Sequence, residues 1–259
     1  SYYENGQIES EVNYKDYVYH GKRTWWHENG QIESEVNYKD GKQDGKRTSW
    51  YENAQIESET IYKDGKRDGK ITWWYGNGQI ESEINYKDSE YHGKWTSWYE
   101  NGQIESEGNF KDDEHHGKWT WWHENGQKES ERNYKDGIPE GEWTSWFGNG
   151  LQSGEGNFKD GTGTFLQLHE NNQKSKEVIL KDGNLKQTEW YENGQKKFEE
   201  NYNYGKLDGR LTWWYENGQI NQEITYKDGI VKTTTWDENG HISSKSIQNN
   251  YGDCISGDC

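Results

Sequence analysis

The sequence has little of what builds an ordinary protein core. Leu, Ile and Val are scarce, Met is absent, and only 27% of the 259 residues are hydrophobic. No apolar run approaches the roughly 20 residues that a membrane span requires. This composition excludes a conventional aliphatic core and a transmembrane helix, and with a net charge of −17 it would be typical of a disordered chain.

Aromatic residues argue against disorder. The chain contains 16 Trp and 19 Tyr, together with 31 Gly and a single Pro. Disordered chains are poor in aromatic side chains, whereas this combination with a short sequence period favours an all-β repeat protein.

Basic residues are also in short supply, with 30 Lys and Arg against 47 Asp and Glu. The balance disfavours nucleic acid and anionic lipid as partners, and it predicts cations or basic protein surfaces instead. No signal peptide is visible. The sequence opens at Ser1 without an initiator Met, inside an incomplete repeat. We interpret this as a processed precursor and expect an extracellular or cell-surface protein, with a cytoplasmic location as the alternative.

The only two cysteines, Cys254 and Cys259, lie in the final segment GDCISGDC. We predict that they pair in a small disulfide loop, which would fit an exported protein. The alternative is two free thiols, because a zinc site would need two further ligands and none is nearby.

One short unit is written repeatedly along the chain. Its Asn-Gly turn, or a close variant, recurs with a period of 24 residues and later of 22 or 24, which indicates a repeat array of eleven copies. The turns begin at Asn5, Asn29, Asn53, Asn77, Asn101, Asn125, Asn149, Asn171, Asn193, Asn217 and Asn239. We predict an array over residues 1–247 and a Cys-containing tail over 248–259.

Each copy is predicted to be a β-hairpin. Asn-Gly between alternating apolar and polar residues is typical of a two-residue type I′ turn, which needs φ > 0 at both positions. Around Asn101-Gly102 this register pairs the following residues: Tyr99 with Ile104, Trp98 with Glu105, Ser97 with Ser106, Trp95 with Gly108 and Thr96 with Glu107.

The connection between copies varies in length by two residues. The segment LKDGNLKQ (180–187) predicts a tight turn at Asp182-Gly183, and the longer YKDGKRDGK (62–70) predicts a four-residue loop. Two extra residues keep every side chain on its original face. Under this register, Trp121 lies beside Ser106 and Phe110 beside Gly117.

This register predicts two different faces of one sheet. The apolar face carries Tyr99, Ile104, Trp95, Ser97, Ser106, Gly108, Phe110 and Trp121. The charged face carries Lys94, Thr96, Trp98, Glu105, Glu107 and Asn109.

Large and small residues alternate on the apolar face. Gly108 leaves room between Trp95 and Trp119, Arg132 can stack on the indoles of Trp119 and Trp143, and the second Gly of each loop faces a Tyr or Phe. We therefore predict an all-β fold, an elongated, twisted antiparallel meander of about 22 strands and about 100 Å.

The segments GKWTSWYENGQIESEGNFKD (93–112) and DGRLTWWYENGQINQEITYKDG (208–229) resemble the MORN repeat, specifically its bacterial variant in YwqK-type antitoxins. The resemblance covers residues 1–245 and implies twisted hairpin arrays that mediate protein contacts, scaffolding and, in some members, lipid association. The copies at 162–191 depart most from the pattern, because Phe165 and Leu168 replace Trp. There we expect a kink, a boundary or a partner site.

Acidic residues form two rows on the predicted charged face, with about 7 Å between neighbours in one strand. The rows are Glu33, Glu57, Glu81, Glu105 and Glu129, and Glu35, Glu59, Glu83, Glu107 and Glu131. A solvated face is the simplest interpretation, and a Ca²⁺ site is an alternative. The metal-ligand candidates are Glu105, Glu107, Asp112, Asp113, His115 and His116. The equivalent positions of His20, His92 and His116 favour a structural role instead.

A tryptophan column accompanies the acidic rows, and we predict that it forms an interaction surface. It consists of Trp26, Trp50, Trp74, Trp98, Trp122 and Trp146. The rings could stack on sugars or meet another sheet, and the alternative is shielding by Thr and Lys stems.

No nucleophile–base pair, phosphate loop or dinucleotide fingerprint occurs, so we expect no enzyme. We predict a structural or protein-interaction repeat protein, exported and self-assembling end to end through its unpaired edge. The alternatives are a cytoplasmic antitoxin or immunity protein that neutralises a basic toxin, and a cation- or carbohydrate-binding surface protein.

Overall fold

A computed structural model describes residues 1–203, 206–207, 209–227, 229–249 and 254–257 of the chain. These residues form 25 β-strands, joined by turns, with no helix among them. The part of the chain that is described thus has no helix with the length and hydrophobicity of a membrane span. The all-β fold predicted from the sequence is confirmed.

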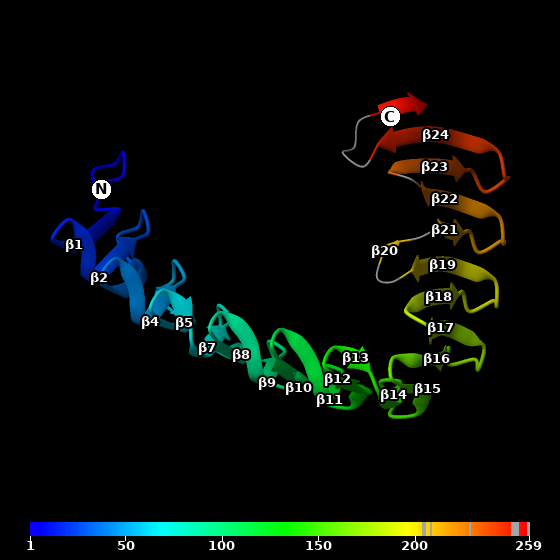
Figure 1. The fold of residues 1–259 in the computed structure, drawn as a ribbon, viewed down its shortest axis with the longest axis horizontal. Coiled ribbons are helices and arrows are strands. Elements are labelled where there is room, and N and C mark those ends of the chain that lie inside the picture. The colour runs from blue at the N-terminus through cyan, green and yellow to red at the C-terminus, as the bar shows by residue number, and fades with distance from the viewer. Residues whose placement is uncertain (204–205, 208, 228, 250–253, 258–259) are drawn as a thin grey trace. The chain divides into compact units, whose positions relative to one another are not determined.

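The chain divides into two compact units, residues 1–129 with 134–137, and residues 130–133 with 138–259. Within each unit, strands that follow one another in sequence pair antiparallel (Figure 1). Strands of the first unit are β1 (Ser10–Lys15), β2 (Val18–Trp26), β3 (Ile32–Lys39), β4 (Lys42–Trp50), β5 (Ile56–Lys63), β6 (Lys66–Arg67), β7 (Gly69–Trp74), β8 (Ile80–Lys87), β9 (Glu90–Trp98), β10 (Ile104–Lys111) and β11 (Glu114–Trp122).

Strand β12 (Lys128–Lys135) contributes residues to both units. Strands of the second unit are β13 (Ile138–Pro139), β14 (Gly141–Trp146), β15 (Gln152–Lys159), β16 (Thr162–Leu168), β17 (Lys174–Lys181), β18 (Asn184–Trp190), β19 (Lys196–Asn203), β20 (Lys206–Leu207), β21 (Gly209–Trp214), β22 (Ile220–Lys227), β23 (Ile230–Trp236), β24 (Ile242–Asn249) and β25 (Cys254–Gly257). The last strand, from the predicted tail, pairs with β24.

The Asn-Gly turns differ from the prediction. At Asn101-Gly102 the N–H of Gly102 donates to the Tyr99 carbonyl at 2.8 Å, and the N–H of Tyr99 donates to the Gln103 carbonyl at 2.9 Å. Only Gly102 has a positive φ, of 81°. This is a three-residue loop, a tight turn followed by a left-handed glycine, and the two-residue type I′ turn predicted here is wrong.

A β-bulge follows each of these loops and corrects the register. Ile104 lies opposite Trp98, and Ser106 lies opposite Ser97, so Glu105 is an extra residue in β10. The predicted pairs Tyr99–Ile104 and Trp98–Glu105 are therefore wrong. The three-residue loop and the bulge each shift the strand pairing by one residue, and these two shifts cancel beyond the bulge. Three predicted pairs are therefore confirmed: Ser97 with Ser106, Thr96 with Glu107 and Trp95 with Gly108.

The second connection is a tight Asp-Gly-type turn in short and long copies alike. Asp64 and Gly65, with φ of 51° and 85°, lie between the paired residues Lys63 and Lys66. The two extra residues of the long copies form a bulge farther along the strand rather than the predicted four-residue loop. In β10–β11, the pairing changes between Glu107–Thr120 and Asn109–His116, which brackets a left-handed Gly117.

This bulge changes which ring each glycine faces. Phe110 lies opposite His115 and, on its other side, opposite Gly93, so the predicted pair Phe110–Gly117 is wrong. The short β15–β16 and β17–β18 pairs lack the bulge. The prediction that a two-residue insertion preserves the faces is nevertheless confirmed, because Trp121 lies opposite Ser106.

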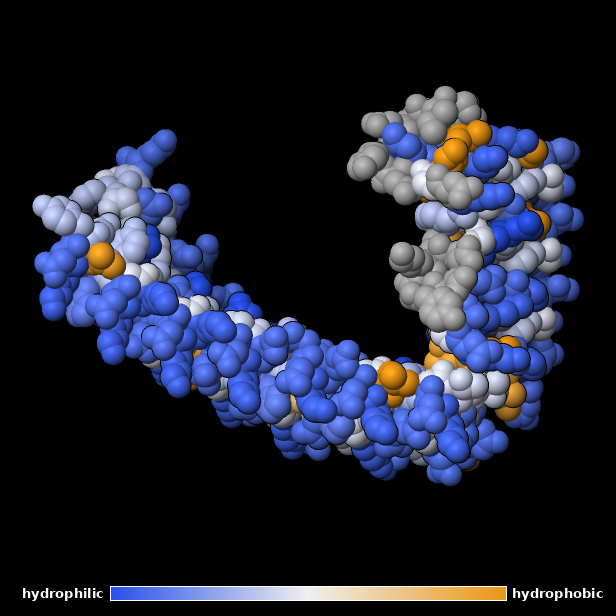
Figure 2. Space-filling view, viewed as in Figure 1, coloured by the Kyte–Doolittle hydropathy of each residue, from blue (hydrophilic) through white to orange (hydrophobic). Residues whose placement is uncertain are grey.

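The core of the first unit lies on the apolar face. Ile71, Ile84 and Tyr86 are buried there, and Trp73, Tyr91, Trp95 and Phe110 pack against them. Gly108 lies against the Trp119 ring as predicted, since an added Cβ would come within 2.1 Å of it. On the face in view, Figure 2 shows mostly hydrophilic residues with isolated hydrophobic ones.

The second unit uses the same packing rule with other residues. Gly156 lies opposite both Trp143 and Phe165, which are buried. The Trp143 ring is 4.5 Å from that of Phe158, and the Arg132 guanidinium is 5.1 Å from the Trp143 ring centre. The predicted contact of Arg132 with the indole of Trp143 is confirmed.

Hydrogen bonds between successive turns join the copies. The Tyr99 hydroxyl donates to the Trp122 carbonyl at 2.6 Å, and Asn101 Nδ2 donates to the Glu124 carbonyl at 3.0 Å. Asn101 Oδ1 also accepts the N–H of Gln103 at 2.9 Å. We call these bonds the turn ladder. They recur at Tyr51, Tyr75, Tyr191 and Tyr215, and at Asn29, Asn53, Asn77, Asn171, Asn193 and Asn217.

Substituting Asn101→Asp is expected to lower the free energy of unfolding by about 1–3 kcal/mol, because the carbonyl of Glu124 loses its donor and faces a carboxylate. Asn149→Asp is the matched control. Asn149 Oδ1 accepts the N–H of Leu151, but its Nδ2 forms no bond to another turn in the described structure. Urea denaturation followed by circular dichroism should separate the two variants, and equal losses would contradict the ladder.

The free energy of unfolding should fall at alkaline pH because the buried phenol of Tyr86 resists ionisation. Burial raises the pKa of Tyr86 to about 12, with a further contribution from the Tyr91 hydroxyl. The folded state thus disfavours the phenolate, so stability is fully present below the ordinary pKa of 10.0 and is lost as the pH rises toward about 12. Tyr86→Phe should flatten this decline in the free energy of unfolding, as measured by urea titrations at several alkaline pH values. If the free energy of unfolding of Tyr86→Phe fell with pH as steeply as that of the wild type, this role of Tyr86 would be contradicted.

Candidate interaction surface

The charged face is neutralised by regular ion pairs. Lys94 Nζ lies 2.8 Å from Glu107, and equivalent lysines pair with the other glutamates of that row. These pairs are Lys22–Glu35, Lys46–Glu59 and Lys70–Glu83. The lysines are about half exposed, so each pair contributes at most about 1 kcal/mol. Beneath them the threonines, including Thr96, are buried.

The tryptophan column lies at the edge of this face, beside the turns. All six rings are neither fully buried nor fully exposed. The backbone carbonyls of Trp74, Trp98 and Trp122 accept turn-ladder bonds from the preceding copy. These residues therefore have a structural role through their backbone, and an interaction role for their rings stays a prediction.

The other acidic row does not share the charged face. Because Glu105 is the extra residue of the bulge, it lines a cavity with Trp95, Ser97 and Ser106 of the apolar face. The prediction that places Glu105 beside Trp98 is wrong for this reason. In the strand pairs β2–β3, β4–β5 and β7–β8 the equivalent bulge residues are Glu33, Glu57 and Glu81. We call these four residues the bulge carboxylates.

The bulge carboxylates have no basic partner among the described residues, in contrast to the Glu107 row. They occur only in the first unit, because the same bulge in the second unit carries other residue types. These are Ser153, Ser175, Lys197, Asn221 and Ser243. The unpaired negative charge at the bulges is thus concentrated in one half of the chain.

A cavity of about 330 Å³ lies where two bulge carboxylates flank the small side chain of Ser97. It is lined by Tyr75, Glu81, Ser82, Trp95, Ser97, Glu105, Ser106 and Trp121. The Ser97 and Ser106 hydroxyls are 2.7 Å apart, and the Trp95 indole N–H donates to Ser106 Oγ at 3.2 Å. These bonds fix the floor of the cavity between the two indoles.

The electrostatics of the cavity are negative. Burial raises the pKa of the Tyr75 phenol, and the charges of Glu81, Glu105 and Glu100 raise it further. The Tyr75 hydroxyl stays protonated and donates to the Trp98 carbonyl at 2.7 Å. Glu81 and Glu105 are partly buried, whereas Glu33 and Glu57 are exposed. This cavity therefore combines two partly desolvated carboxylates with aromatic walls.

The predicted metal ligands are distributed among different partners. Asp113 accepts the N–H of Tyr91 at 2.6 Å, His116 lies 3.3 Å from Asp136, and the His115 ring packs 4.2 Å from Trp119. His92 lies 3.5 Å from Asp112, while Glu107 pairs with Lys94. Within the described residues, no group of three or more His, Cys, Asp or Glu could hold a metal ion.

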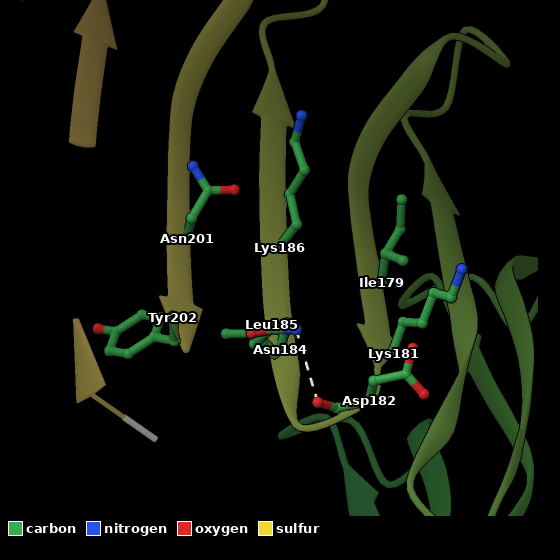
Figure 3. Close-up of a pocket in the computed structure, with 8 residues that line it drawn as sticks. All are labelled: Ile179, Lys181, Asp182, Asn184, Leu185, Lys186, Asn201 and Tyr202. Atoms are coloured by element: carbon green, nitrogen blue, oxygen red, sulfur yellow. Dashed lines mark hydrogen bonds between the residues drawn. The ribbon is translucent and has the colours of Figure 1, made fainter. Parts of the chain in front are cut away.

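A second cavity, of about 470 Å³, lies in the other unit at the Asp182-Gly183 turn (Figure 3). Its lining residues are Ile179, Lys181, Asp182, Asn184, Leu185, Lys186, Asn201 and Tyr202. Asn184 Nδ2 donates to the Asp182 carbonyl at 3.5 Å, and Lys186 pairs with Glu199 at 3.3 Å.

The predicted disulfide lies outside the described residues, since Cys259 and the side chain of Cys254 are not part of them. Sequence reasoning also missed Tyr75 and Glu81 as members of one site. The alternation of Trp and Ser along this row indicated space at Ser97, but the bulge that brings Glu105 there could not be recognised.

No curated protein matches the chain. Among solved structures, a Tc holotoxin pore from Photorhabdus luminescens with a TccC3 mutation is 7% identical with a TM-score of 0.20. A TcdB2-TccC3-TEV crystal structure is 10% identical with a TM-score of 0.20. The matches cover 99% and 96% of this chain but only 15% and 17% of those chains. TM-scores of 0.20 are too low to indicate a shared fold.

The profile of the MORN repeat variant matches the chain eight times. The matched residues are 1–16, 19–40, 43–64, 67–88, 91–112, 116–136, 183–204 and 207–228. The unmatched residues 137–182 include the copies predicted to depart most, yet they keep the hairpin architecture in β14–β17. The narrower resemblance to YwqK-type antitoxins is not tested by this match. The matched segments span more than half of the sequence, and the chain belongs to the MORN repeat variant family.

Proposed function

We propose that the chain is a non-catalytic interaction protein that binds a basic protein partner through the bulge carboxylates of its first unit. The observation that carries the proposal is the contrast between two acidic rows of equal length. The Glu107 row is neutralised by lysines, whereas the bulge carboxylates have no basic partner among the described residues. A regular row of unpaired charge favours association with a surface of the opposite sign.

The setting of this contact is part of the proposal. An exported surface scaffold is our first choice, and a cytoplasmic antitoxin that neutralises a basic toxin would use the same row. End-to-end stacking finds less support at the last turn. There Asp237 replaces the ladder Tyr, and its carboxylate accepts the N–H groups of Asn239 and His241 within its own turn.

Two matched fourfold variants test the proposal. One converts Glu33, Glu57, Glu81 and Glu105 to Gln, and the other converts Glu35, Glu59, Glu83 and Glu107 to Gln. A synthetic lysine-rich peptide should bind the wild-type protein at low salt, and the first variant should bind at least about tenfold more weakly. The second variant should lose less affinity than the first, because it keeps the unpaired row, although its freed lysines repel the cationic peptide. Failure of the wild-type protein to bind, or equal loss in both variants, would overturn the proposal.

A further inference from the structure

The cavity around Ser97 differs from every equivalent place in the first unit. Its lining includes the indoles of Trp95 and Trp121 and the carboxylates of Glu81 and Glu105. One copy earlier the residue at the position of Trp95 is Ile71, and two copies earlier it is Arg47. The array repeats its architecture, but this combination of side chains occurs once among these copies.

In other copies, the indoles of the apolar face contact guanidinium groups of the chain itself. Arg23 occupies the position equivalent to Trp95, and its guanidinium carbon lies 4.1 Å from the centre of the Trp25 ring. Arg132 lies 5.1 Å from the Trp143 ring centre in the second unit. The chain therefore stacks its own guanidinium groups on indoles of this face, as cation–π interactions favour.

None of the eight described residues that line the Ser97 cavity is Lys, Arg or His. Glu81 and Glu105 are partly buried without a basic partner in the described structure. Partial burial makes unpaired carboxylates unfavourable unless a cation joins them. Tyr75 does not neutralise them, because a phenol carries no positive charge and its hydroxyl donates to the Trp98 carbonyl. A volume of about 330 Å³ is sufficient for one side chain.

We infer that this cavity receives one arginine or lysine side chain of the partner protein, with the cation between Glu81 and Glu105 and its stem against Trp95 and Trp121. The inference rests on the proposed function and assigns the specific anchor within it. The flanking bulge carboxylates, Glu33 and Glu57, then attract the partner without selecting a single residue. A neutral sugar could stack on the indoles and donate hydroxyl groups to the carboxylates, but it would leave their two negative charges uncompensated.

The test follows the indole N–H signals of Trp95 and Trp121 in ¹⁵N-labelled protein, assigned with Trp95→Phe and Trp121→Phe. The probes are Nα-acetylarginine methylamide, its neutral isostere Nα-acetylnorleucine methylamide, and N-acetylglucosamine. We expect saturable shifts with the arginine derivative only. Glu105→Gln should weaken this binding by about fivefold or more, as loss of a partly buried charge pair would, while Glu57→Gln should leave it unchanged.

The outcomes separate this inference from the proposed function. Stronger binding of the sugar or of the norleucine derivative, or equal effects of Glu105→Gln and Glu57→Gln, overturns the cation site. If the lysine-rich peptide still binds through the bulge carboxylates in that case, the proposed function stands without this anchor. Both glutamine substitutions are nearly isosteric and partly or fully exposed, so neither is expected to unfold the protein.

Discussion

Replacing Ile84 by Ala is expected to lower the free energy of unfolding by about 2–5 kcal/mol. Ile84 is fully buried and lies opposite Ile71 on one side and Trp95 on the other. Its removal leaves a cavity at the centre of the first unit, where few other aliphatic groups exist to close it. Because each copy in an array is stabilised by its neighbours, the loss should extend to the copies on both sides.

Ile104→Ala is the matched control for this effect. Ile104 is 37% exposed beside its turn, so the same chemical change should cost well under half as much. Urea denaturation followed by far-ultraviolet circular dichroism measures both. If the two variants lost the same stability, the assignment of Ile84 to the core would be wrong.

Gly108→Ala is expected to destabilise the protein by about 1–3 kcal/mol through overpacking. The new methyl group would lie 2.1 Å from Trp119 Cδ2. Trp119 is 3% exposed, and its indole N–H donates to the Asn109 carbonyl at 3.0 Å. The ring therefore cannot move aside without breaking that bond. The midpoint of urea denaturation should fall, and the tryptophan emission should change in the folded state.

Gly76→Ala gives the control for this second variant. An added Cβ at Gly76 meets no atom within 4 Å, and its φ, like that of Gly108, is not in the left-handed region. Gly76 lies in a turn and Gly108 in β10, but neither substitution is strained by its φ, and Gly76→Ala should leave the stability nearly unchanged because space is available there. If Gly108→Ala were as stable as the wild-type protein, Trp119 would not cover this position.

Strand pairing in the middle of each hairpin could be predicted because side-chain parity is robust. Trp95 lies opposite Gly108, and Thr96 lies opposite Glu107, although the predicted turn was wrong. An odd-numbered loop followed by a one-residue bulge has the same net register as a two-residue turn. The period and the size alternation of Trp, Ser and Gly therefore sufficed for the core.

The turns could not be predicted, since Asn-Gly fits two loop types. Asn101 bonds to the N–H of Gln103 and to the carbonyl of Glu124 in the next copy. The second bond depends on how copies stack, which is a tertiary effect beyond the reach of a dipeptide rule. The same limitation affected the candidate site, because the position of Glu105 depends on the bulge that this loop requires.

The proposed cation site depends on the placement of Glu105 at the bulge, and nuclear Overhauser effects between β9 and β10 report that placement. We predict cross-strand contacts of Trp98 with Ile104 and of Ser97 with Ser106, and contacts of the Glu105 side chain with the indole protons of Trp95 or Trp121. Contacts of Trp98 with Glu105 in an uninterrupted register, with Glu105 remote from both indoles, would show that β10 has no bulge at Glu105.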